Sequence, residues 1–206
     1  MNAYSRVPWR CGKASLLANS RPPTGRAGFR LAPTLPLFAA LLICLSVMIR
    51  SGDTRGESRL PPHQMLAPGA VLFSGAPEAP SPANGGEVGN VLAFIGPTGV
   101  VVVGTGASDR HGERLLAALA RITPKPVVLA INAYAAPEHA LGNTAFARRG
   151  IPILAHRETG AYLTRNCGDC IDALEKLVGP EPLTGSRLKR PGQLIAGSTT
   201  LNPGGR

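Results

Sequence analysis

Aromatic residues are scarce in this sequence and make up only 4% of its 206 residues. No basic segment interleaved with aromatic side chains is present, so the usual signature of a nucleic-acid-binding domain is missing and we expect no nucleic-acid partner. A regular glycine period is also missing, which excludes a collagen-like chain although Gly (25) and Pro (20) are frequent. Hydrophobic residues account for 44% of the chain, enough for the core of one domain of ordinary size.

The net charge of the chain is +10, and the charge is unevenly distributed. The first 34 positions contain no acidic residue and six basic ones: Arg6, Arg10, Lys13, Arg21, Arg26 and Arg30. The uncharged run LPLFAALLICLSVMI follows at 35–49. It is shorter than the roughly 20 apolar residues of a spanning helix, and a basic leader before a short apolar run is typical of a secretory signal or N-terminal anchor. We therefore interpret residues 1–50 as a signal or membrane anchor of a periplasmic or inner-membrane-anchored protein. A buried core helix is the alternative.

Residues 51–62 are polar and rich in glycine and proline, which predicts a linker before a folded part at 63–206. In that part, short apolar runs alternate with amphipathic segments, a pattern that predicts helices packed on a sheet. We expect strands at 69–73, 91–95, 100–103, 127–131 and 151–156, and one more in the tail. We expect helices at 108–122, at about 139–149 and at 158–179.

Two segments of the folded part resemble the metallo-β-lactamase superfamily. They are GPTGVVVVGTG at 96–106 and YAAPEHALGNTAF at 134–146. Within that superfamily the chain is most similar to the quinoprotein relay system zinc metallohydrolases, and the similarity extends over about 63–206. The resemblance implies an α+β fold, namely the first half of an αββα sandwich, so we expect an incomplete metallo-β-lactamase-like domain.

The resemblance also assigns the positions of the superfamily's zinc motif, H-x-H-x-D-H. Its first two histidines fall on Tyr134 and Ala136, its aspartate on Glu138, and its last histidine on His139. An aspartate that normally braces the metal loop is replaced by Gly104. Ala136 cannot bind zinc, and Tyr134 is a poor ligand because its phenol must lose a proton with a pKa of about 10. Only Glu138 and His139 remain as candidate metal ligands.

A catalytic zinc needs about three protein ligands and a water molecule. We therefore expect zinc, the metal of the family, to bind weakly or not at all here, and we assign no catalytic residue. A weak single-metal site would need His111 or His156 as a further ligand. The alternative is a turn that carries a solvated Glu-His pair.

Two cysteines of the folded part, Cys167 and Cys170, are three residues apart on a predicted helix. Their spacing suits a disulfide, and an exported location favours one. Free thiols, or a redox or metal role, are the other interpretations.

The sequence thus favours a metallohydrolase homologue of the quinoprotein relay type that is inactive because ligands are lost and the chain is truncated. A non-catalytic periplasmic binding or interaction protein is the alternative. Membrane contact would come through residues 1–50, and no protein partner or substrate can be named.

The basic leader and apolar run generate a first prediction. Residues 1–60 fused to a reporter that is active only outside the cytoplasm should give reporter signal. The same fusion with two arginines placed in the apolar run should give none, because charges in that run oppose entry into the membrane. A reporter that stays in the cytoplasm with the unmodified leader would contradict the export hypothesis.

Overall fold

The computed structural model describes residues 60–201. The run at 35–49 therefore lies outside the described residues, as does most of the expected linker. Among residues 60–201, no helix combines the length and the apolar character that crossing a membrane requires.

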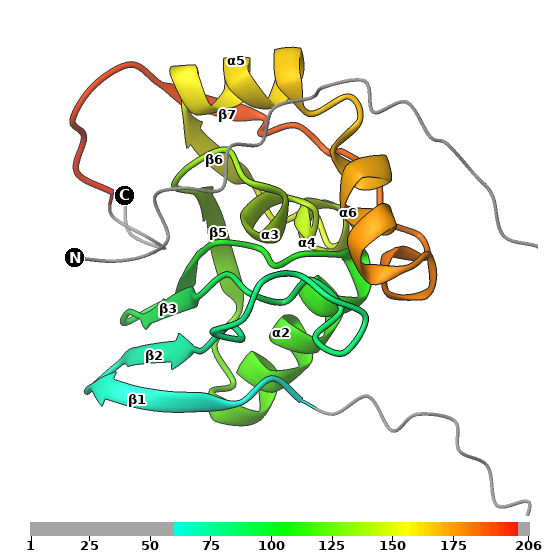
Figure 1. The fold of residues 1–206 in the computed structure, drawn as a ribbon. Coiled ribbons are helices and arrows are strands. Elements are labelled where there is room, and N and C mark those ends of the chain that lie inside the picture. The colour runs from blue at the N-terminus through cyan, green and yellow to red at the C-terminus, as the bar shows by residue number, and fades with distance from the viewer. Residues whose placement is uncertain (1–59, 202–206) are drawn as a thin grey trace, which may run out of the picture. The chain divides into compact units, whose positions relative to one another are not determined.

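Seven strands form one mixed sheet in which neighbours in the sequence are neighbours in space (Figure 1). They are β1 (His63–Ala67), β2 (Ala70–Phe73), β3 (Val91–Ile95), β4 (Val100–Val103), β5 (Val127–Asn132), β6 (Ile153–His156) and β7 (Gln193–Ile195). β1 to β4 pair antiparallel, whereas β4 to β7 run parallel. The predicted α+β class is confirmed, and so is the hairpin of β3 and β4, in which Ile95 pairs with Val100.

Parallel strands need crossover connections, and helices supply them. The helices are α2 (Asp109–Ile122), α3 (Pro137–Ala140), α4 (Asn143–Arg148), α5 (Arg157–Asn166) and α6 (Cys170–Val178), followed by the 3-10 turn η2 (Glu181–Leu183). α2 begins at Asp109 and is capped by Ser108, whose side chain accepts a hydrogen bond from the backbone N–H of His111.

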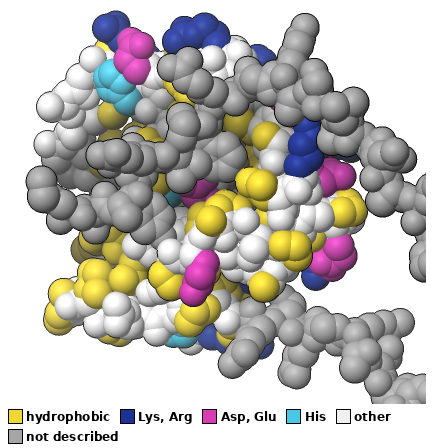
Figure 2. Space-filling view, in the orientation of Figure 1, with side chains coloured by type: hydrophobic (Ala, Val, Ile, Leu, Met, Phe, Trp, Pro, Cys, Tyr) yellow, Lys and Arg dark blue, Asp and Glu magenta, His cyan; other side chains and the backbone are white. Residues whose placement is uncertain are grey.

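The main hydrophobic core lies between one face of the sheet and helices α2 and α4. Strand residues that alternate along β2 to β4, such as Val71, Ala93 and Val102, pack against Leu115 and Phe146, and all five are fully buried. The alternation of burial follows from the period of two along a strand. Hydrophobic side chains also gather on the surface over β1 to β3 (Figure 2), where Met65, Leu66 and Phe94 are exposed.

Two predicted helices are in fact pairs of helices. The segment predicted as one helix at about 139–149 is α3 and α4, because Gly142 lies between them and packs against the loop after β4. A Cβ at Gly142 would be 1.9 Å from the carbonyl oxygen of Thr105. This close approach turns the chain and ends α3, a constraint that local sequence does not reveal.

The prediction of a single helix at 158–179 is also wrong. The structure has two helices there: α5 ends at Asn166, and α6 starts at Cys170. Cys167 and Cys170 lie on either side of this break and form a disulfide with a Cα–Cα distance of 4.6 Å. The disulfide therefore joins two helices, whereas the sequence had placed both cysteines inside one.

The packing of α2 on the sheet generates a second prediction. Leu115→Ala should lower the free energy of unfolding by about 2–5 kcal/mol, since this fully buried side chain would leave a cavity under the sheet. Leu177→Ala is the matched control, because Leu177 of α6 is 43% exposed and its loss should change stability by roughly 0.5 kcal/mol or less. Urea unfolding of both variants measures the difference, and equal losses would contradict the core described above.

Candidate functional site

The segment that resembles the metal loop connects β5 to α4. β4 and β5 are parallel, so their carboxyl ends meet at one edge of the sheet. Gly104, Thr105 and Gly106 follow β4, and residues 133–142 follow β5. The two connections are bonded through the backbone: the Gly104 N–H donates to Ile131 O (2.8 Å) and the Gly142 N–H to Gly106 O (2.9 Å).

A buried network of three polar side chains holds these connections together. The Asn143 Nδ2 donates to Asn132 Oδ1 (2.8 Å) and to the carbonyl oxygen of Lys189 (2.7 Å). In return, Asn132 Nδ2 donates to Asn143 Oδ1 (3.0 Å), which also accepts a bond from Thr105 Oγ1 (2.8 Å). Thr105, Asn132 and Asn143 are each at most 1% exposed, and buried polar groups are stable only when they are hydrogen-bonded in this way.

The network ends on the backbone of the surviving histidine. The carbonyl oxygen of His139 accepts bonds from the Thr105 N–H (2.9 Å) and from Asn132 Nδ2 (3.1 Å). His139 is thus fixed through its main chain. Sequence reasoning noted Asn143 as part of the motif but missed Asn132 and Thr105, because a polar residue at a strand end has many common roles.

The His139 ring itself is poorly provided with polar partners. Its Nδ1 is buried and has no hydrogen-bond partner among the described residues. The Tyr134 ring lies against it, with centroids 4.3 Å apart. Burial lowers the pKa of His139 to about 4, so the ring is neutral at pH 7.

Gly104 lies beside this unpartnered nitrogen. A Cβ at Gly104 would be 3.0 Å from His139 Nδ1, so a side chain here would reach the ring directly. The backbone of Gly104 has a φ of +86°, a conformation that costs a residue with a Cβ about 1–2 kcal/mol. The glycine thus fits its backbone and leaves the histidine without the brace that the family resemblance implies.

Tyr134 and Ala136 do not supply metal ligands, and Glu138 is a carboxylate in a partly buried setting. Burial raises the pKa of Tyr134, and the Glu138 carboxylate adds to the effect, so a tyrosinate ligand is even less accessible than usual. Burial also raises the pKa of Glu138. Ala136, at the start of α3, is 8% exposed and offers no donor atom.

His111 and His156, the other candidate ligands, form hydrogen bonds away from the metal loop. His111 Nδ1 accepts a bond from the Ala107 N–H (3.2 Å), and His156 Nδ1 accepts one from the Glu158 N–H (3.3 Å) at the start of α5. Within residues 60–201, no three His, Cys, Asp or Glu side chains are grouped closely enough to hold a metal ion. Among the described motif positions only Glu138 and His139 offer the donor atoms that zinc takes, which is fewer than the roughly three protein ligands of a catalytic zinc, so the donor set of residues 60–201 does not fit one.

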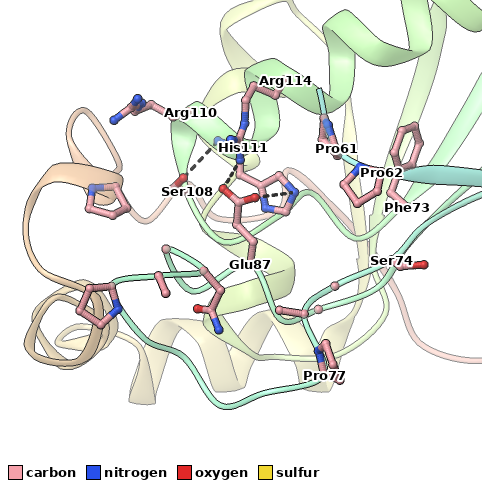
Figure 3. Close-up of a pocket in the computed structure, with 18 of the residues that line it drawn as sticks. Pro61, Pro62, Phe73, Ser74, Pro77, Glu87, Ser108, Arg110, His111 and Arg114 are labelled. Atoms are coloured by element: carbon pink, nitrogen blue, oxygen red, sulfur yellow. Dashed lines mark hydrogen bonds and ion pairs between the residues drawn. The ribbon is translucent and has the colours of Figure 1, made fainter. Parts of the chain in front are cut away.

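A cavity of about 550 Å³ adjoins this loop at Gly89. Gly89 lies against Glu138 and His139, since a Cβ there would be 2.9 Å from Glu138 Cγ and 3.0 Å from His139 Nε2. In Figure 3 the Glu87 carboxylate points into the cavity toward His111 and Arg114 on α2. Arg114 contacts this carboxylate directly, and His111 Nε2 is 3.9 Å from it.

The polar groups of this cavity are poorly solvated. Burial raises the pKa of Glu87, although Arg114 opposes the shift. Burial, with a further contribution from the charge of Arg114, lowers the pKa of His111 to about 3. Since His111 Nδ1 accepts a hydrogen bond, the proton of the neutral ring is on Nε2 and faces Glu87.

Solved structures of metallo-β-lactamases are similar to the described part of the chain. The enzyme from Pontibacter korlensis matches with a TM-score of 0.52 and 18% identity over 70% of this chain and 56% of that protein. The DIM-1 enzyme exposed to ceftazidime matches with a TM-score of 0.50 and 17% identity over 71% of this chain and 57% of that protein. The fold is that of the metallo-β-lactamases.

This similarity establishes the fold alone. The chain spans less than three-fifths of the length of these enzymes. No protein-family model matches the sequence, and a search of curated proteins finds no match either. The quinoprotein relay type rests on the sequence motifs and remains a hypothesis.

The burial of His111 generates a third prediction. Its pKa is about 3 when folded and about 6.5 when unfolded. The unfolded chain therefore binds the extra proton between these values, so folding stability is complete above pH 6.5 and falls as the pH is lowered toward 3. His111→Asn, whose Oδ1 can accept the Ala107 bond, should make the decrease shallower by at most about 1.4 kcal/mol per pH unit.

Urea unfolding at several pH values between 7 and 4 measures this slope. Leu177→Ala is the control, because this exposed side chain does not titrate and its loss should leave the slope unchanged. A slope that is the same in wild type and His111→Asn would show that His111 is protonated in the folded protein.

Proposed function

We propose that this chain is a non-hydrolytic homologue of the quinoprotein relay type of metallo-β-lactamase-fold hydrolases. The observation that carries the proposal is the state of His139, the only histidine kept in the motif. Its Nδ1 is buried and has no partner within residues 60–201, the Tyr134 ring lies against its ring, and its neighbour Gly104 has no side chain to orient it.

The chemistry of the remaining groups supports the same proposal. Metal-assisted hydrolysis needs an ion that lowers the pKa of a bound water molecule to about 7. An ion held only by Glu138 and His139 would lack the third protein ligand of a catalytic site. A bracing carboxylate commonly contributes about 10–100-fold to metal affinity, and Gly104 cannot provide it.

We place the protein in the periplasm or at the inner membrane. The uneven charge of residues 1–34 and the apolar run at 35–49 support this location. The disulfide between Cys167 and Cys170 agrees with an oxidising compartment.

A binding protein is the second candidate, and the cavity beside Glu87 favours it. A volume of about 550 Å³ suits a small molecule, and its polar groups do not depend on the motif histidines. The two candidates differ in what the cavity does: a binding protein takes up a small molecule there in saturable fashion, whereas a homologue that has only lost its activity does not.

The fourth prediction concerns zinc. The purified protein should retain less than one zinc ion per chain after dialysis and should not hydrolyse lactam, thioester or phosphoester model substrates. The physical reason is the ligand set, which is short of the roughly three protein ligands of a catalytic zinc. Elemental analysis measures the metal, and activity assays with and without chelator measure turnover.

A restored variant provides the matched comparison. Tyr134→His, Ala136→His and Glu138→Asp together should raise zinc affinity, because they return the motif ligands. Adding Gly104→Asp should raise it further but lower stability by about 1–2 kcal/mol, given the positive φ at this position. Two tightly held zinc ions in the unmodified chain, or hydrolysis that chelator abolishes, would refute the proposal.

A further inference from the structure

A second cavity, of about 360 Å³, lies between α5 and the segment that leads into β7. α5 follows β6 directly and packs against β6 and β7. Basic side chains gather along the top edge of the molecule, where α5 runs (Figures 1 and 2). This cavity shares no residue with the metal loop or with the cavity beside Glu87.

Three arginines line this cavity, which we name the arginine groove: Arg157 and Arg165 of α5, and Arg190 before β7. No Asp or Glu is among its lining residues. Arg157 has an exposed carboxylate neighbour, Glu158, at 3.4 Å. Arg165 and Arg190 form no ion pair or side-chain hydrogen bond with another residue of the part described, 60–201. Both side chains are exposed, so within the described part their guanidinium groups can contact a ligand.

Ion pairs with carboxylates of this chain are formed by Arg110, Arg114, Arg148 and Arg149, whereas Arg121 and Arg187 form none within residues 60–201. Pairing is therefore common but not general in this part, where acidic and basic residues are close in number. The arginine groove is distinguished by its lining, in which three arginines and no carboxylate surround one hollow, so the local potential is positive.

The floor of the arginine groove is apolar. Leu194 of β7 is 57% exposed and lies over Gly160 of α5, where a Cβ would be 2.8 Å from Leu194 Cδ2. Ala161 and Pro191 extend this floor. The hydroxyl of Thr164 is not available for recognition, because it donates to the carbonyl oxygen of Gly160 (2.9 Å). The arginine groove thus combines three arginines with apolar lining residues.

We propose that the arginine groove binds a phosphate monoester that carries an apolar group. A phosphate monoester has a charge of about −1.5 to −2 at pH 7, which several guanidinium groups can share. Each planar guanidinium can donate two parallel hydrogen bonds to phosphate oxygens. The apolar group of the ligand lies on Leu194 and Ala161 and removes the exposed leucine from water.

Calorimetric titration of the full-length protein with phenyl phosphate tests the proposal. We expect saturable binding that weakens as salt is added, because the arginines are exposed and their charges are screened. Arg165→Gln and Arg190→Gln should each weaken binding by about three- to tenfold, the range for charge-assisted hydrogen bonds at a partly exposed site. Arg165→Lys should lose less than Arg165→Gln, since it keeps the charge but not the fork.

Arg121→Gln is the matched control, because exposed Arg121 at the end of α2 lies outside the groove and should leave binding unchanged. Inorganic phosphate should bind more weakly than phenyl phosphate, and phenol should not bind measurably. Equal affinity for phenyl phosphate and inorganic phosphate would refute the role of Leu194. Equal losses in Arg121→Gln and Arg165→Gln, or no binding at low salt, would overturn the site itself.

Discussion

The hydrogen bonds among Thr105, Asn132 and Asn143 are the constraint on which the arrangement at the carboxyl edge of the sheet depends. They connect the loop after β4, the end of β5, the start of α4 and the backbone of residue 189. Each polar group of this cluster is buried, so removing one partner would leave another unsatisfied at a cost of about 1–3 kcal/mol. The loop therefore keeps its shape independently of any metal ion.

This independence is what our proposal of a degenerate metal loop requires, since the shape of the loop must then not depend on a bound ion. The network bonds the carbonyl oxygen of His139 and does not involve its ring. Substitutions at Tyr134 and Ala136 consequently leave the backbone of the loop in place. Gly104 likewise leaves the backbone of the loop unchanged. Its positive φ suits the turn after β4, and its missing side chain affects only the His139 ring.

The metal loop, the cavity beside Glu87 and the arginine groove differ in how strongly burial opposes charge. Around His139 and Glu138, and in the cavity beside Glu87, burial opposes charge: the pKa values of His139 and His111 are lowered and those of Glu138 and Glu87 are raised. The arginine groove is exposed instead, and within residues 60–201 two of its arginines, Arg165 and Arg190, form no ion pair. A ligand with a negative charge is thus accommodated at α5 with little desolvation, whereas the metal loop would have to desolvate it.

Much of the fold follows from local patterns. The hairpin of β3 and β4, the strands β5 and β6, and the capped start of α2 could all be predicted, because apolar runs, glycine-rich turns and a serine cap act over a few residues. The breaks at Gly142 and at Cys167 could not, since each depends on contact between distant segments. For Gly142 the partner is the Thr105 carbonyl, 37 positions earlier.

The candidate site divides in the same way. The sequence by itself determined which donor atoms exist: a tyrosine, an alanine, a glutamate and one histidine at the motif positions, and a glycine at 104. Only the tertiary structure decided that His139 Nδ1 has no partner within residues 60–201, that Asn132 completes a buried network, and that Arg165 and Arg190 line one groove. Residue identity is a local property, whereas burial, hydrogen-bond partners and charge pairing depend on which distant segments the folded sheet brings together.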